Sequence, residues 1–138
     1  MRVLFFVLLG ISTSICQSAA QERNADDIVQ SMLSHDSALY GGYSSWDEKE
    51  LSRLGDAACV AAARFLEGKD LSITDIRTAL LIIRFSFEAP TQIRSESDRQ
   101  PRAASTLLDT LEKLSASSTL KEEFSVTRKA LKRTARTR

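Results

Sequence analysis

The stretch ITDIRTALLIIRFSF, residues 73–87, decides the fold class. Its apolar side chains lie almost all round a helical wheel, which is typical of a central helix buried by neighbours on several sides. A β-strand over residues 79–87 is the alternative, because β-branched residues are frequent there. The helix formers at residues 75–81 and the absence of a partner strand argue against that strand. Ala89-Pro90 ends the segment, since a residue before proline avoids helical geometry.

Two helical segments are predicted on the amino-terminal side of this stretch. Asn24 is a good N-cap for an amphipathic helix that ends near His35. The capping-box pattern Ser45-Trp46-Asp47-Glu48 opens the second segment, and Gly68 ends it. Because Gly55-Asp56 falls inside this second segment, one kinked helix and two short helices both fit the pattern.

Two more helices are predicted on the carboxy-terminal side. Residues 91–100 are polar and should form an exposed connection. Pro101 suits the first position of an amphipathic helix that breaks at residues 115–118. Thr119-Leu120-Lys121-Glu122 repeats the capping-box pattern and opens a last helix, which should fray beyond Lys132. We therefore expect an all-α fold, a small bundle of about 4–6 helices.

An internal repeat is a further hypothesis. Residues 55–85 and residues 100–131 each contain an alanine pair, an amphipathic helix, a capped break and another helix. Aligning Ala57-Ala58 with Ala103-Ala104, and Ile83 with Leu131, gives a period of about 46 to 48 residues, close to the long end of helical-repeat periods.

The turn that precedes the first alanine pair resembles part of a HEAT repeat. The resemblance is carried by LGDAA at residues 54–58 and by the apolar residues Val60, Phe65 and Leu66. It covers at most residues 46–134, the second unit lacks the Gly-Asp turn, and the usual proline is missing from residues 57–66. The resemblance implies a short HEAT-like α-solenoid that serves protein contacts without chemistry of its own. A generic helical bundle is the alternative.

The first 20 residues have the features of a secretion signal. Met1 and Arg2 form a positive start, and residues 3–9 form an apolar run that is too short to span a bilayer. Ser18-Ala19-Ala20 supplies the small residues that a signal peptidase requires, so Gln21 should be the new terminus. We expect a cleaved signal peptide at residues 1–20 and a periplasmic or extracellular location.

Processing would leave one helical domain at residues 21–134, followed by a basic frayed end at residues 135–138. A lipoprotein is disfavoured because Ile15, not a small residue, precedes Cys16. An uncleaved anchor is the other alternative, although no later stretch is apolar enough to span a membrane. Cys59, the remaining cysteine, lies among apolar residues and should be a buried, unreactive thiol.

The charges of the processed chain balance but are unevenly distributed. Residues 21–67 contain four basic and nine acidic residues, and residues 68–138 contain 14 basic and nine acidic residues. The last helix carries the basic residues Arg128, Lys129, Lys132, Arg133 and Arg136. An anionic-surface contact and a solubilising helix end are both compatible with this pattern. Nucleic acid is not expected, because the interleaved aromatic residues of single-strand binders are missing.

Aromatic residues form the other candidate binding surface. Tyr40, Tyr43 and Trp46 lie near the flexible pair Gly41-Gly42. Tyrosine and tryptophan are frequent anchors of protein interfaces. The same residues can equally cover the core of a small domain from a loop.

No residue pattern indicates a catalytic, metal or cofactor site. His35, the only histidine, has Asp36 and two serines beside it, but a histidine at a helix end is the simpler interpretation. Asp47 and Glu48 fit the first turn of a helix, and Glu50 fits a solvated face, better than an acid pair for catalysis.

These patterns favour an exported, non-catalytic protein-binding or scaffolding module of the inhibitor, immunity or adaptor type. One alternative is an envelope-associated protein that contacts anionic surfaces through its basic end. The other is an enzyme whose carboxylates the sequence does not identify. We expect a protein partner, no cofactor and no transmembrane segment after processing.

Overall fold

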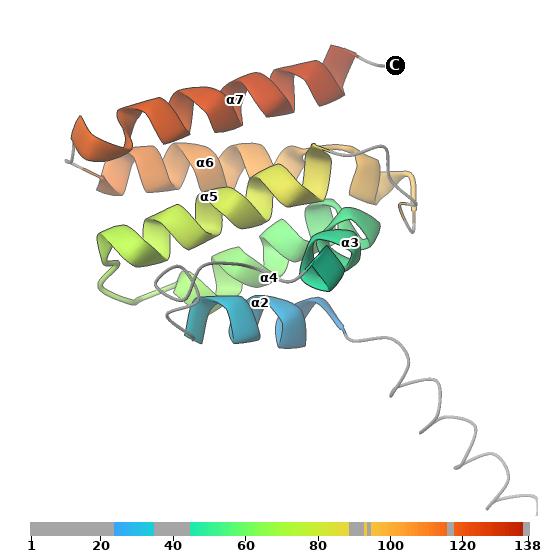
Figure 1. The fold of residues 1–138 in the computed structure, drawn as a ribbon, viewed down its shortest axis with the longest axis horizontal. Coiled ribbons are helices and arrows are strands. Elements are labelled where there is room, and N and C mark those ends of the chain that lie inside the picture. Colours follow the sequence, from blue (N-terminus) through green and yellow to red (C-terminus); the bar gives the residue numbers. More distant parts are fainter. Residues whose placement is uncertain (1–23, 35–44, 89–92, 94, 116–117, 137–138) are drawn as a thin grey trace, which may run out of the picture.

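The computed structural model describes residues 24–34, 45–88, 93, 95–115 and 118–136, apart from the side chains of residues 45–47. Within these residues the chain is all-helical, with six α-helices and no strand, which confirms the predicted fold class (Figure 1). The helices are α2 (Ala25–Ser34), α3 (Ser45–Leu54), α4 (Asp56–Leu66), α5 (Ile73–Phe87), α6 (Arg102–Leu114) and α7 (Lys121–Arg136). Two short 3₁₀ turns, η1 (Ser97–Arg99) and η2 (Ser118–Leu120), precede α6 and α7.

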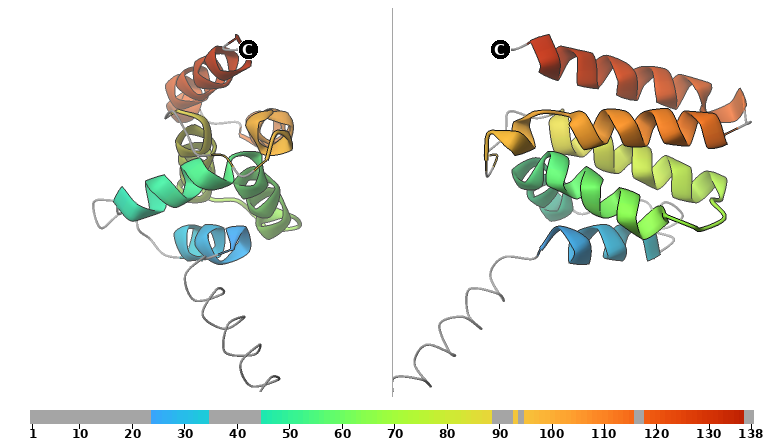
Figure 2. Two further views of the ribbon diagram at one scale, coloured as in Figure 1. Left: turned by 90° about the vertical axis from the view of Figure 1, so that its right-hand side faces the viewer. Right: turned by 180° about the vertical axis from the view of Figure 1, so that it is seen from behind.

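The helices form two layers (Figures 1 and 2). Helices α2, α4 and α6 pack in succession in one layer, and α5 and α7 form the other, which α3 continues by packing on α5 while running across the direction of the other helices. Each helix thus packs on the helix two places along the chain. Helix α5 contacts the other five described α-helices, which confirms the prediction of a central helix.

The start of α5 is fixed by a reciprocal capping box. The Ser72 hydroxyl accepts a hydrogen bond from the Asp75 amide at 3.1 Å, and the Asp75 carboxylate accepts one from the Ser72 amide at 2.9 Å. These bonds satisfy two of the amides that a helix N-terminus leaves unpaired. The alternative strand over residues 79–87 was wrong, because this whole stretch is helical.

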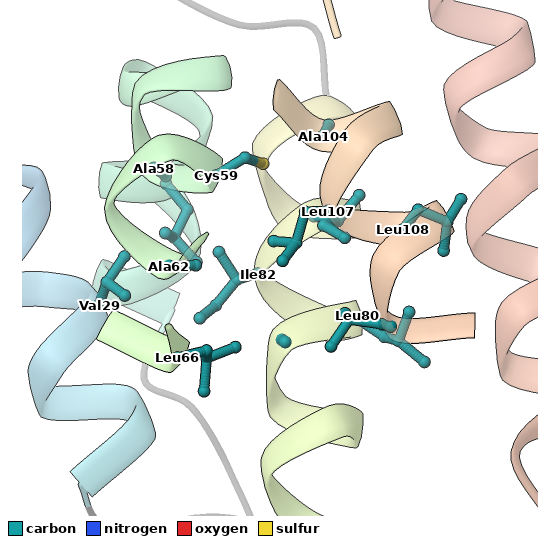
Figure 3. Close-up of a cluster of buried hydrophobic side chains, with 14 of the residues drawn as sticks. Val29, Ala58, Cys59, Ala62, Leu66, Leu80, Ile82, Ala104, Leu107 and Leu108 are labelled. Carbon is teal, nitrogen blue, oxygen red and sulfur yellow. The ribbon is translucent and has the colours of Figure 1, made fainter. Parts of the chain in front are cut away.

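Small residues of α4 pack on larger residues of α5 and α6 in the core (Figure 3). Ala58 and Ala62 of α4 are fully buried, as is Ile82 of α5. Cys59 is also fully buried, and burial raises the pKa of its thiol far above the ordinary value. The prediction of a buried, unreactive cysteine is therefore supported by its surroundings.

Gly55 separates α3 from α4, so the alternative of two short helices is the correct one. Its backbone has φ 58° and ψ −130°, a conformation that is essentially restricted to glycine. A Cβ atom at Gly55 would overlap the backbone carbonyl oxygen of Asp98 in η1. The turn therefore needs glycine both for its dihedral angles and for this close approach.

The remaining boundaries mostly follow the sequence. The Asn24 side chain accepts a hydrogen bond from the Asp27 amide at 2.9 Å, which confirms the predicted N-cap of α2. Helix α6 begins one residue after Pro101. Helix α7 does not end near Lys132 but continues to Arg136, and the Thr134 hydroxyl donates to the Phe87 carbonyl at 3.1 Å.

Several predictions concern residues outside this description. They include the signal peptide at residues 1–20, His35, and the side chain of Ser45 in its predicted capping box. None of the described helices combines the length and the apolar character needed to cross a membrane.

Candidate functional site

The candidate site lies between α4 and α6, which are joined at their N-terminal ends by Asp56. One Asp56 carboxylate oxygen accepts a hydrogen bond from the Ala103 amide and the other from the Ala104 amide, each at 2.9 Å. A carboxylate here satisfies unpaired amides of α6 and interacts favourably with the helix dipole. Burial raises the pKa of Asp56, and the two amide hydrogen bonds oppose that rise.

From this joint the two helices point in the same direction, and the distance between them increases toward their C-terminal ends (Figure 2, right). A groove of about 840 Å³ lies between them and extends to the turn after α4. Its apolar lining consists of Val60, Ala63, Leu66, Leu71, Ala103, Leu107, Leu111 and Leu114. We call this feature the α4–α6 groove.

The α4–α6 groove has a buried floor and exposed walls. Leu66, Leu107 and Leu111 are nearly buried and form the floor. In contrast, Leu114 is 63% exposed and Val60 is 43% exposed. Complete burial of a fully exposed side chain of this size contributes about 1.5–3 kcal/mol, so a ligand that covers the exposed parts of these walls is stabilised by a fraction of that amount.

Polar side chains lie along the rim of the groove. Arg64 pairs with Asp26 at 3.0 Å, and the Lys69 ammonium lies 3.4 Å from the centroid of the Phe65 ring. Arg102 lies on the opposite helix, and Glu67 is the one carboxylate of the lining. Because Asp26 pairs with Arg64, the rim carries a small excess of positive charge, which comes from Lys69 and Arg102.

Two threonines of α6 complete the lining, and both of their hydroxyl protons are already used in hydrogen bonds within α6. The Thr106 hydroxyl donates to the Arg102 carbonyl at 3.1 Å, and the Thr110 hydroxyl donates to the Thr106 carbonyl at 2.9 Å. Each hydroxyl is thus satisfied within its own helix. The groove wall between the cations consequently behaves as a largely apolar surface.

The predicted aromatic surface is not brought to this groove by any described contact. Tyr40 and Tyr43 lie outside the described residues, and Trp46 lies in α3 with its side chain outside the description. Their role in partner binding stays a prediction.

The predicted basic surface on α7 is divided between packing and exposure. Arg128 pairs with Asp109 at 3.2 Å and also with Glu112, so it holds α7 against α6. Lys129, Lys132, Arg133 and Arg136 are exposed. Contact of Arg128 with an external anionic surface would therefore require breaking its ion pairs with α6.

The acidic residues show no arrangement for metal binding. Among the described residues, no three histidine, cysteine or acidic side chains lie together in a way that could hold a metal ion. Glu50 does not lie on a solvated face as predicted. Its side chain is 16% exposed and pairs with Arg53 at 2.8 Å.

The α4–α6 groove itself was not predicted from the sequence. Val60 and Leu114 belong to the apolar faces of the predicted helices, but in the structure both side chains are exposed. The chain matched no protein-family model, no curated protein and no solved structure.

Proposed function

We propose that this chain is a non-catalytic protein-binding module and that its partner docks in the α4–α6 groove. The observation that carries the proposal is an open apolar groove of about 840 Å³ whose walls include the exposed side chains of Val60 and Leu114. Contiguous exposed apolar surface with a polar rim is typical of interaction sites. The small positive excess on the rim adds selectivity for the partner.

Two further parts of the proposal concern architecture and location. The two-layer order, in which each helix packs on the next but one, supports a short HEAT-like α-solenoid. Asp56 of the LGDAA stretch binds the start of the second alanine pair, so it links the two segments of the proposed repeat. The leader pattern at residues 1–20 supports export to the periplasm or the extracellular space.

A groove substitution tests the proposed function. We expect Leu114→Asp to reduce partner recovery from the native host at least about 10-fold, because it places a charge where apolar surface must be buried. The measurement is affinity capture with the purified chain, with the recovered proteins quantified by mass spectrometry.

Val126→Asp is the matched control, because Val126 is 38% exposed on α7 and is not part of the groove lining. Both variants should retain the thermal unfolding midpoint of the original chain within a few degrees, as is usual for exposed positions. Equal recovery of the partner with Leu114→Asp and with the original chain would refute the proposal. An equal loss of partner recovery with Leu114→Asp and with Val126→Asp would also refute the proposal.

A further inference from the structure

We infer that the partner segment is an amphipathic α-helix with acidic residues on its flanks, an inference that rests on the proposed function. The shape, the hydrogen-bonding state and the rim charges of the α4–α6 groove each favour this occupant. These three features are independent of one another.

The dimensions of the groove suit a helix of about four turns. Its lining extends along α6 from Arg102 to Leu114, which is about 20 Å at the rise of 1.5 Å per residue. Ala63 and Ala103 leave room between the larger side chains of the lining. Apolar residues spaced i, i+3 or i+4, and i+7 on a partner helix would insert between the two walls.

The hydrogen-bonding state of the walls disfavours an extended peptide. Both walls are helices, whose interior backbone groups are already bonded within the helix. The structure shows no strand edge among the described residues. The amides and carbonyls of an extended peptide that face these walls would therefore be buried without partners, which costs several kcal/mol in an apolar site. A helix satisfies these groups internally.

The open side of the groove disfavours a simple acyl chain. Val60 and Leu114 are exposed at its walls, so a bound hydrocarbon chain would keep one side in water. An amphipathic helix instead presents its polar face on that side. The groove therefore matches a ligand with two chemically different faces.

The rim charges specify the flanks of the partner helix. Arg102 lies at the N-terminal end of α6, and Lys69 follows the C-terminal end of α4. Because α4 and α6 are parallel, these cations mark opposite ends of the groove. Neither takes part in an ion pair with another described residue. Acidic residues near both ends of a bound helix would complement them.

A peptide selection tests this inference. A phage library of randomised helix-forming peptides is selected on the full chain and counter-selected on the Leu114→Asp variant. Enriched sequences should carry apolar residues at i, i+3 or i+4, and i+7, with aspartate or glutamate on the flanks. The synthetic consensus peptide should bind the Leu114→Asp variant at least about 10-fold more weakly by fluorescence anisotropy.

Reversing the charges of Lys69 and Arg102 tests whether the rim selects acidic flanks on the partner helix. The double substitution Lys69→Glu with Arg102→Glu should weaken the acidic-flanked peptide about 10-fold, and a lysine-flanked version of that peptide should bind this variant better than the original chain. Lys129→Glu on α7 is the control and should leave both affinities unchanged, because Lys129 is exposed and outside the groove.

Three outcomes would overturn the inference. They are failure to enrich peptides that depend on Leu114, enrichment of peptides that tolerate a central proline, and enrichment of basic flanks. If no helical peptide is enriched but oleate binds saturably and this binding depends on Leu114, the groove is a lipid site instead. If host protein capture still depends on Leu114 in these cases, the proposed function stands and only the helical, acidic partner is refuted.

Discussion

Replacing Gly55 with alanine should lower the free energy of unfolding by about 4 kcal/mol. The backbone at φ 58° and ψ −130° costs a non-glycine residue about 1–3 kcal/mol. The added Cβ also overlaps the Asp98 carbonyl oxygen, and such overpacking costs about 1–3 kcal/mol more. Urea unfolding followed by circular dichroism measures the change.

Gly68→Ala is the control for this substitution. Gly68 also has a positive φ, 72°, but an added Cβ meets no atom within 4 Å. Its replacement should cost only the backbone strain, about 1–2 kcal/mol. Equal costs at Gly55 and Gly68 would contradict the close approach of η1 to the turn.

Replacing Asp56 with alanine should lower the free energy of unfolding by about 3 kcal/mol. The substitution removes both hydrogen bonds to the Ala103 and Ala104 amides, and a buried amide left without a partner costs about 1–3 kcal/mol. Urea unfolding gives the loss in stability. Hydrogen exchange should also accelerate at these two amides, because the start of α6 loses its link to α4.

Asp75→Ala provides the comparison for Asp56. The Asp75 carboxylate also accepts a backbone amide bond, but it does so in an exposed capping box within its own helix. Its loss should cost about 1 kcal/mol, the usual value for a helix cap. Unchanged exchange at Ala103 and Ala104 in the Asp56→Ala variant would contradict the role of Asp56 as the joint between α4 and α6.

The fold was predictable where local chemistry decides it. Neighbouring residues are enough to indicate that α5 is apolar on nearly all sides, and that Asn24 and Ser72 are suitable helix caps. The choice between one and two helices at Gly55 was not predictable, because it depends on contact with Asp98, which is 43 residues away in the chain. Such an approach exists only once the helices have packed.

Helix α6 was predicted correctly, but the groove along one of its faces was not. The apolar stripe of α6 combines two adjacent faces of the helical wheel. Ala104 and Leu108 are buried and do not line the groove, whereas Ala103, the nearly buried Leu107 and the exposed Leu114 line it. Periodicity shows that both faces are apolar. The divergence of α4 from α6 decides which face stays open, and that divergence is a property of the packed structure.

For the basic residues of α7, too, the sequence pattern does not show which of them are paired within the fold. The helical spacing placed Arg128 correctly on α7, but its ion-pair partners Asp109 and Glu112 belong to α6. Surface pairs of this kind are worth only about 0–1 kcal/mol. They nevertheless reduce the set of basic residues that are left for an external anion.

Site-specific photo-crosslinking in the native host tests the binding role of the α4–α6 groove most directly. A photoreactive amino acid is introduced at Ala63 or Thr110, which line the groove, and at Lys129, which is exposed on α7 outside it. We predict the same protein adduct from both groove positions and none from Lys129. An adduct formed at Lys129 and absent at Ala63 and Thr110 would contradict the assignment of this groove as the binding site.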